Sequence, residues 1–171
     1  MRAFPLYSQR DTRWANDSMG LDEEATIGQY GCLLTSFSMV AGYFKHDATP
    51  DVLNSIFTTN GVYVAGDLLT DWALQTVFGD CKHVGSLDYG NLPADMRRLR
   101  QLSANLKLAV ILELDYDHDP NDGIQTHFVV LVGYNGDTFH IADPWTGTVV
   151  EFKDVYGKTP EKTLQKFIIY R

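Results

Sequence analysis

The chain has 171 residues, of which 44% are hydrophobic and 21% are charged. This composition supports one substantial core and argues against a disordered chain, so we expect a single domain over residues 1–171. The formal net charge of −8 argues against nucleic acid and anionic membranes as partners.

Helical periodicity follows a loop-like stretch over residues 1–30. From Cys32 to Phe44, apolar residues recur at helical spacing. Thr49 and Pro50 form a helix start, because threonine caps helix N-termini and proline suits the first helical position. The expected helices cover residues 32–44, 50–57, 67–78 and 93–106.

The second half of the chain has the pattern of strands. Expected strands cover residues 108–114, 128–134, 138–142 and 148–152, and residues 167–170 are expected to form an edge strand. The Asn135-Gly136-Asp137 sequence predicts a hairpin turn between the second and third strands. Helices followed by an antiparallel sheet indicate an α+β fold.

The sequence also bears on location. No apolar run is long enough to span a bilayer, and the first residues lack the apolar core of a secretory signal. We therefore expect no membrane segment, and a protein that is cytoplasmic or released by lysis or secretion. Two cysteines are too few for a disulfide framework, which fits a reducing compartment or a catalytic thiol.

Cys32 follows Gly31 and opens the first predicted helix. The free N–H groups and partial positive charge of a helix N-terminus favour a thiolate, and they can also hold an oxyanion. Taken alone, however, a cysteine in this position is more often a buried helix-capping residue than a nucleophile.

Two further residues complete a possible triad. His127 begins one predicted strand, and Asp143 ends the next, 16 residues later. Because the predicted hairpin makes these strands antiparallel neighbours, both side chains should lie at the same end of the sheet. The chain therefore offers a nucleophile (Cys32), a base (His127) and a residue that orients the base (Asp143).

Three sequence blocks resemble the bacteriocin-processing, double-glycine-leader peptidases (peptidase family thirty-nine), and more closely their stand-alone bacterial and phage branch. The blocks are Y-S-Q-R-D-T-R-W-A-N-D, T-I-G-Q-Y-G-C-L-L-T-S-F-S-M-V and H-F-V-V-L-V-G-Y-N-G-D-T-F-H-I-A-D-P-W. The resemblance implies a papain-like fold, with a helical half that carries the cysteine and an antiparallel sheet that carries the histidine. It also implies the Cys32, His127 and Asp143 triad.

The resemblance further implies a glutamine that donates to the oxyanion hole. In transporter-linked relatives this glutamine lies a few residues before the cysteine, where the present chain has Thr26. The Y-S-Q-R-D block favours Gln9 as the donor, and Gln29 is the alternative.

An acidic segment before His127 resembles the start of a calcium loop. Its residues are Asp115, Asp117, Asp119, Asp122 and Gly123. Proline occupies the position of the sharp turn (Pro120), and Thr126 replaces the bidentate glutamate, so we do not expect calcium there. We interpret the segment as a border of the cleft that would attract basic substrates. The remaining histidines show no zinc-ligand spacing with the cysteines, and Cys81 is expected to be a packed small residue.

The expected function is that of a cysteine peptidase that cleaves an amide bond without a cofactor or a metal. We expect a monomer that acts on a peptide or a peptidoglycan stem peptide. The alternatives are a lytic peptidoglycan amidase or endopeptidase, an acyltransferase on the same fold, and a non-catalytic peptide-binding module. The presence of Cys32 argues against the last of these.

Overall fold

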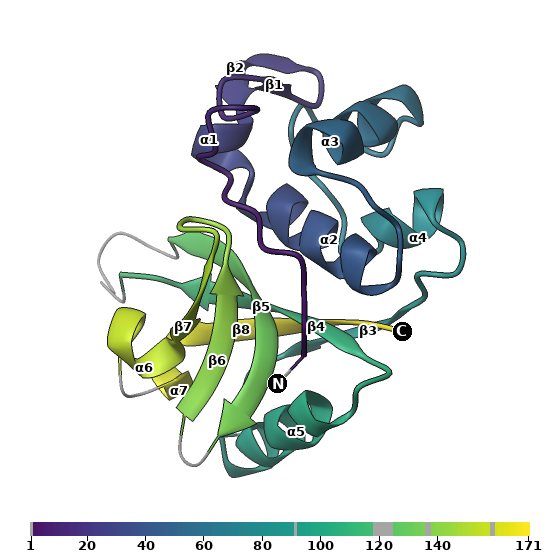
Figure 1. Ribbon diagram of the computed structural model, residues 1–171. Coiled ribbons are helices and arrows are strands. Elements are labelled where there is room, and N and C mark those ends of the chain that lie inside the picture. Colours follow the sequence, from purple (N-terminus) through teal and green to yellow (C-terminus); the bar gives the residue numbers. More distant parts are fainter. Residues whose placement is uncertain (1, 91, 118–124, 136–137, 158–159) are drawn as a thin grey trace.

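The computed structural model describes residues 2–90, 92–117, 125–135, 138–157 and 160–171 (Figure 1). The helices are α1 (Ile27–Tyr30), α2 (Cys32–Tyr43), α3 (Pro50–Thr59), α4 (Ala73–Val77), α5 (Leu92–Ala104), α6 (Phe152–Val155) and α7 (Pro160–Thr163). The strands are β1 (Ser18–Met19), β2 (Asp22–Thr26), β3 (His83–Asp88), β4 (Ala109–Asp115), β5 (Thr126–Asn135), β6 (Thr138–Asp143), β7 (Thr148–Glu151) and β8 (Leu164–Tyr170).

A six-stranded antiparallel sheet forms the C-terminal half, in the order β3-β8-β4-β5-β6-β7. Helices α2, α3 and α4 gather on one side of this sheet, and α5 lies on the other (Figure 1). Most helical residues thus precede the main sheet strands in the chain. The expected α+β arrangement is confirmed.

Both faces of the sheet are buried, which explains why its central strands read as nearly continuous apolar runs. Along β4, Ala109 and Ile111 belong to the core cluster that includes the residues of α2. The alternate residues Val110 and Leu112 belong to a second cluster that includes Leu99 of α5. The alternation of side chains along a strand therefore divides the core into two layers.

Helix α2 is surrounded on all sides, because every residue from 34 to 41 is buried. It packs between α3 and the sheet, so its apolar surface is wider than one stripe. Two of its buried hydroxyls have partners: Ser36 Oγ donates to Phe128 O of β5 at 3.2 Å, and Ser38 Oγ donates to Leu34 O at 3.2 Å. The helix that begins at Cys32 is thus held firmly against β5.

The expected edge strand at 167–170 was wrong in position. Strand β8 contains these residues but lies inside the sheet, between β3 and β4. Its last four residues are buried, which fits an interior strand. The strand on the outer side of β8 is β3. Its residues are half-buried or exposed and include Gly85. They do not alternate between apolar and polar, so the sequence pattern did not predict a strand here.

Three other expectations require correction. The helix expected at 67–78 is reduced to Ala73–Val77, because Leu68 pairs with Ala65 in a bridge and Leu68 N–H closes a turn on Ala65 O. The strand expected to end at Phe152 stops at Glu151, and Phe152 instead opens α6. The loop expected over residues 1–30 contains a small hairpin, β1–β2, and α1.

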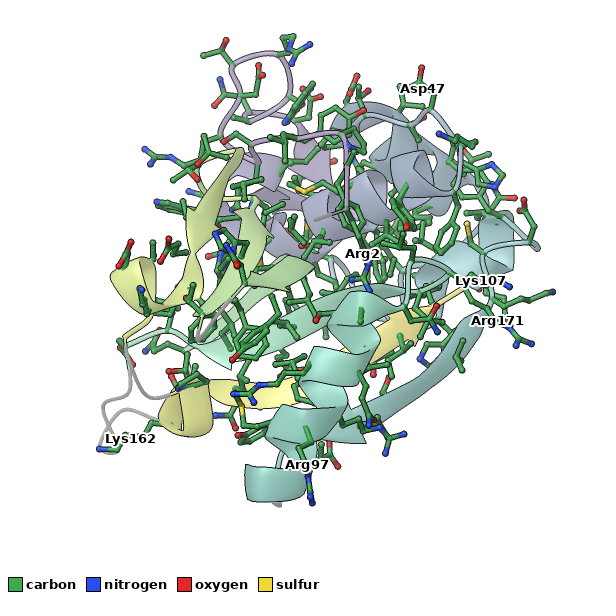
Figure 2. The ribbon with its side chains drawn as sticks, turned by 60° about the horizontal axis from the view of Figure 1, so that its bottom comes forward. Arg2, Asp47, Arg97, Lys107, Lys162 and Arg171 are labelled. Atoms are coloured by element: carbon green, nitrogen blue, oxygen red, sulfur yellow. The ribbon has the colours of Figure 1, made fainter. Side chains whose placement is uncertain are left out.

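The N-terminal segment is tied to both halves of the molecule. The Arg2 guanidinium donates to Leu131 O at 3.1 Å and Asn105 O at 3.0 Å, and it also bonds Leu102 O. Figure 2 shows Arg2 reaching between the sheet and the end of α5. Trp14 is buried and its indole N–H donates to Ser8 O at 2.8 Å, so it anchors the loop that precedes α1.

The basic cluster of α5 faces solvent. Arg97, Arg98 and Arg100 are exposed, and Figure 2 shows Arg97 projecting away from the sheet. The Arg100 guanidinium lies over the ring of Tyr134, 4.7 Å from the ring centroid. None of the described helices is both long and apolar enough to cross a membrane.

Candidate active site

Cys32 stands at the first position of α2, after a turn that only glycine fits. A Cβ atom at Gly31 would lie 2.4 Å from Ile27 O, so any side chain there would displace α1. Cys32 is a half-buried free thiol at the N-terminus of α2. The first-turn N–H groups of a helix lack partners within the helix and are therefore able to bind an anion beside the sulfur.

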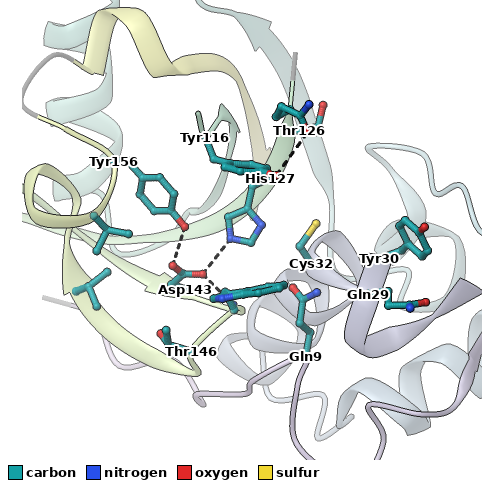
Figure 3. Close-up of a pocket in the computed structure, with 14 residues that line it drawn as sticks. Gln9, Gln29, Tyr30, Cys32, Tyr116, Thr126, His127, Asp143, Thr146 and Tyr156 are labelled. Atoms are coloured by element: carbon teal, nitrogen blue, oxygen red, sulfur yellow. Dashed lines mark hydrogen bonds and ion pairs between the residues drawn. The ribbon is translucent and has the colours of Figure 1, made fainter. Parts of the chain in front are cut away.

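His127 and Asp143 meet at one end of the β5–β6 ladder, as the sequence predicted. Strands β5 and β6 pair antiparallel, with Val130 opposite Ala142. The hairpin turn predicted at Asn135-Gly136-Asp137 includes residues 136–137, which lie outside the described residues. His127 Nε2 is 3.0 Å from Asp143 Oδ1, and both side chains are buried. The other ring nitrogen of His127 points toward the Cys32 sulfur (Figure 3).

The charges around His127 favour its protonated form. Burial by itself lowers the pKa of this imidazole, but hydrogen bonds and charge interactions with Asp143 and Cys32 outweigh burial and raise the pKa to about 9. Burial raises the pKa of Asp143, but the hydrogen bond and charge of His127 and further donors lower it below its ordinary value. The imidazole therefore carries a proton at neutral pH.

Two donors that the sequence did not reveal complete the shell of Asp143. The Trp145 backbone N–H donates to Asp143 Oδ1 at 2.8 Å, and the buried Tyr156 hydroxyl donates to Oδ2 at 2.7 Å. Both carboxylate oxygens thus have partners, which fixes the face that Asp143 offers to His127 (Figure 3). Tyr156 directly follows the short helix α6, and the sequence around it contains no motif that predicts a contact with Asp143.

Gln9 lies beside Cys32 and is 1% exposed. Its Nε2 donates to Gly28 O at 3.1 Å, which leaves the second hydrogen of that nitrogen available. Gln9 Oε1 is buried and has no hydrogen-bond partner among the described residues. Gln29 lines the same pocket but is exposed and belongs to α1. Burial next to Cys32 therefore favours Gln9 over Gln29 as an oxyanion donor.

A crossing between the N-terminal segment and the β6–β7 turn holds Gln9 in place. Gln9 N–H donates to Pro144 O at 2.7 Å, and Ser8 Oγ donates to Trp145 O at 3.2 Å. Gly147 has φ +70°, and a Cβ there would lie 2.9 Å from Ser8. Glycine is thus required for this close approach.

These groups open into one pocket of about 620 Å³ between α1–α2 and the sheet. Cys32, His127, Asp143 and Gln9 all line it (Figure 3). The triad residues and the favoured glutamine are therefore brought together in a single cleft.

One group of described residues has the spacing of metal ligands. The ligand atoms of His46, Asp80 and Cys81 lie within 4.8 Å of one another, which the sequence spacing did not suggest. His46 Nε2 is 2.9 Å from Asp80 Oδ1, and the imidazole stacks on Phe78. Burial and, after it, the nearby charge of Asp80 raise the pKa of the Cys81 thiol to about 12, which disfavours the thiolate form that a metal ligand requires.

The acidic segment compared with a calcium loop falls largely on residues 118–124, outside the described part. Its flanks are described: Gln125 N–H donates to Asp115 Oδ1 at 3.1 Å, and Tyr116 N–H donates to Gln125 O at 3.1 Å. Tyr116 and Gln125 also line the pocket. The segment thus begins and ends beside the cleft.

A protein-family model matches nearly the whole chain. The model of the Peptidase_C39 like family matches residues 1–166. The chain belongs to this family. The match spans all three sequence blocks that carried the resemblance, and it indicates the chemistry of a cysteine peptidase for this member of the C39-like family.

Eleven solved chains match this C39-like chain in structure. One is the crystal structure of a Bacillus anthracis protein assigned to the C39-like peptidases. It shares 16% sequence identity with a TM-score of 0.55, over 100% of this chain and 96% of the other. At this identity the likeness shows the fold, which is the expected papain-like α+β arrangement. No curated protein matches the chain.

Proposed function

We propose that this C39-like protein is a cysteine peptidase that hydrolyses an amide bond through Cys32, His127 and Asp143, with Gln9 as an oxyanion donor. The observation that carries the proposal is the placement of His127 between Asp143, 3.0 Å away, and Cys32 at the start of α2. A protonated imidazole beside the sulfur stabilises a thiolate, which is the reactive form of cysteine.

The proposed cycle needs no cofactor. The Cys32 thiolate attacks the carbonyl carbon, and the oxyanion accepts from the Cys32 backbone N–H and from Gln9 Nε2. Collapse breaks the C–N bond as His127 donates its proton to the leaving amine, which leaves a thioester. His127 then takes a proton from water, the hydroxide attacks the thioester, and the acid and the Cys32 thiolate are released while His127 remains protonated.

Alkylation of Cys32 tests the ion pair directly. An ordinary thiol, with a pKa of about 8.5, is almost entirely protonated at pH 6. We expect iodoacetamide at pH 6 to modify Cys32 in the folded protein at least about tenfold faster than in the denatured chain. Peptide mass spectrometry follows both cysteines separately.

The matched control for this measurement is His127→Ala, which should lose the advantage at pH 6. Cys81 is a poor reference because it is fully buried and reacts slowly for that reason alone. If Cys32 reacts no faster than in the denatured chain, the triad is not assembled and a peptide-binding role replaces hydrolysis.

Tyr156→Phe should lower kcat on the order of tenfold, because a buried carboxylate oxygen loses its donor. Without this hydrogen bond, the pKa of Asp143 rises, and the more basic carboxylate holds the His127 proton more tightly. The alkaline limb of the kcat profile should then move to higher pH. Steady-state kinetics across pH measures both effects.

The control is Tyr63→Phe, which removes another buried hydroxyl, bonded to Asn54 Oδ1 at 2.7 Å in the helical half. It should reduce thermal stability without moving the pH profile. An identical effect of both variants on the profile would mean that Tyr156 acts only through stability.

A further inference from the structure

Large apolar side chains that face solvent gather in the cleft that holds Cys32. The apolar residues that line it are Tyr30, Tyr116, Trp145, Val150, Val155 and Tyr156. Four of them remain about half exposed: Tyr30 by 58%, Tyr116 by 50%, Trp145 by 47% and Val155 by 51%. Exposed apolar surface collected at one place, and not scattered singly, marks a binding site.

The polar part of the lining offers little to a charged ligand. Apart from Cys32, His127 and Asp143, the described polar lining side chains are neutral: Gln9, Gln29, Gln125, Thr126 and Thr146. Asp143 is 2% exposed, and its oxygens already accept from His127 and Tyr156. A charged substrate side chain would therefore lose water in this cleft without gaining a partner from the described lining, which is unfavourable.

The cleft has two walls with Cys32 between them. Gln29 and Tyr30 come from α1, whereas Val150 and Val155 come from β7 and α6 at the far edge of the sheet. Figure 3 shows Gln29 and Tyr30 on the opposite side of Cys32 from Tyr156. We call the wall formed by Val150 and Val155 the sheet wall. If a peptide binds across the Cys32 sulfur, one of the two residues that flank the scissile amide would contact this wall.

The sheet wall is rigidly connected to the candidate triad. Val155 directly precedes Tyr156, whose hydroxyl bonds Asp143, and Phe152 of the same short helix is buried in the core. The valines are therefore presented at a fixed place relative to His127, as selection of one substrate side chain requires.

We propose that the substrate is a peptide in which a residue next to the scissile amide carries a bulky, uncharged, apolar side chain, and that this side chain packs against Val150 and Val155. The inference rests on the proposed function and adds the substrate class to it. It differs from the expectation that the acidic segment attracts basic substrates.

Paired quenched-fluorescence peptides provide the test. Each pair differs at one residue beside the cleavable bond, with leucine in one peptide and aspartate or lysine in the other. The wild type should prefer leucine on the order of 10- to 100-fold in kcat/KM, the factor that burial of one leucine side chain provides. Val155→Lys should reduce the preference for leucine over aspartate about tenfold, since the ammonium would pair with the carboxylate.

The control is Val84→Lys, because Val84 is equally exposed, at 53%, but lies on β3 at the opposite edge of the sheet. It should leave the preference unchanged. Cleavage without a preference for leucine, or equal effects of the two lysine variants, would overturn the substrate class alone. Failure to cleave any peptide, together with slow alkylation of Cys32 at pH 6, would overturn the proposed function itself.

Discussion

His127→Ala should lower kcat/KM for peptide hydrolysis by at least about 10⁴-fold, because the variant loses both the acid that protonates the leaving amine and the partner of the thiolate. The fold should survive, since Asp143 keeps hydrogen bonds from Trp145 N–H and the Tyr156 hydroxyl. Initial rates with a leucine-containing peptide measure the loss. His83→Ala, on β3 and away from the cleft, should stay within about threefold of the wild type.

The pH profile of the wild type checks the same role. The pKa of His127 is raised from its ordinary value of 6.5 to about 9. Between these two pH values the imidazole therefore stays protonated and can still donate a proton to the leaving amine. Activity should therefore fall as pH rises through about 9, and not near 6.5. A decline near 6.5, or more than a tenth of the activity left in His127→Ala, would contradict the assignment of His127.

Local pattern was sufficient for the central parts of the fold. The helix that starts at Cys32 was predictable because apolar spacing and the preceding glycine both act over a few residues. The proximity of His127 and Asp143 was predictable because, in two antiparallel neighbouring strands, the start of the first and the end of the second lie at the same end of the ladder. Their hydrogen bond follows from that register.

The remaining features depend on contacts between distant segments. The interior position of β8 is set by its pairing with both β3 and β4, and β3 itself carries almost no strand pattern. Tyr156 reaches Asp143 only because the β6–β7 hairpin and α6 fold back over β6. No spacing rule encodes such a contact. The apolar cleft is similarly non-local, since its walls come from α1 and from the far edge of the sheet.

The extent of the domain, the monomeric state and the peptide or peptidoglycan substrate stay predictions. The assignment of Gln9 was also a prediction from one sequence block, and Gln29 was the closer residue in the chain. The structure separates the two by burial, because Gln9 is buried in the pocket that Cys32 lines while Gln29 faces solvent. This difference leads to a paired experiment.

Gln9→Ala should lower kcat by about 10²- to 10³-fold and change KM little, because a donor to the oxyanion acts mainly in the transition state. Gln29→Ala should change kcat by less than about threefold, since the exposed Gln29 side chain on α1 does not donate to the oxyanion in the proposed cycle. Steady-state kinetics on the same peptide compares the two variants.

Alkylation of Cys32 distinguishes an oxyanion donor from a purely structural residue. Gln9 also supports α1 through its hydrogen bond to Gly28 O, so its loss could disturb the start of α2. Iodoacetamide forms no oxyanion, and Gln9→Ala should therefore keep the fast alkylation of Cys32 at pH 6 while hydrolysis fails. Parallel loss of alkylation and hydrolysis would reduce Gln9 to a structural role, and a large fall of kcat in Gln29→Ala would transfer the donor role to Gln29.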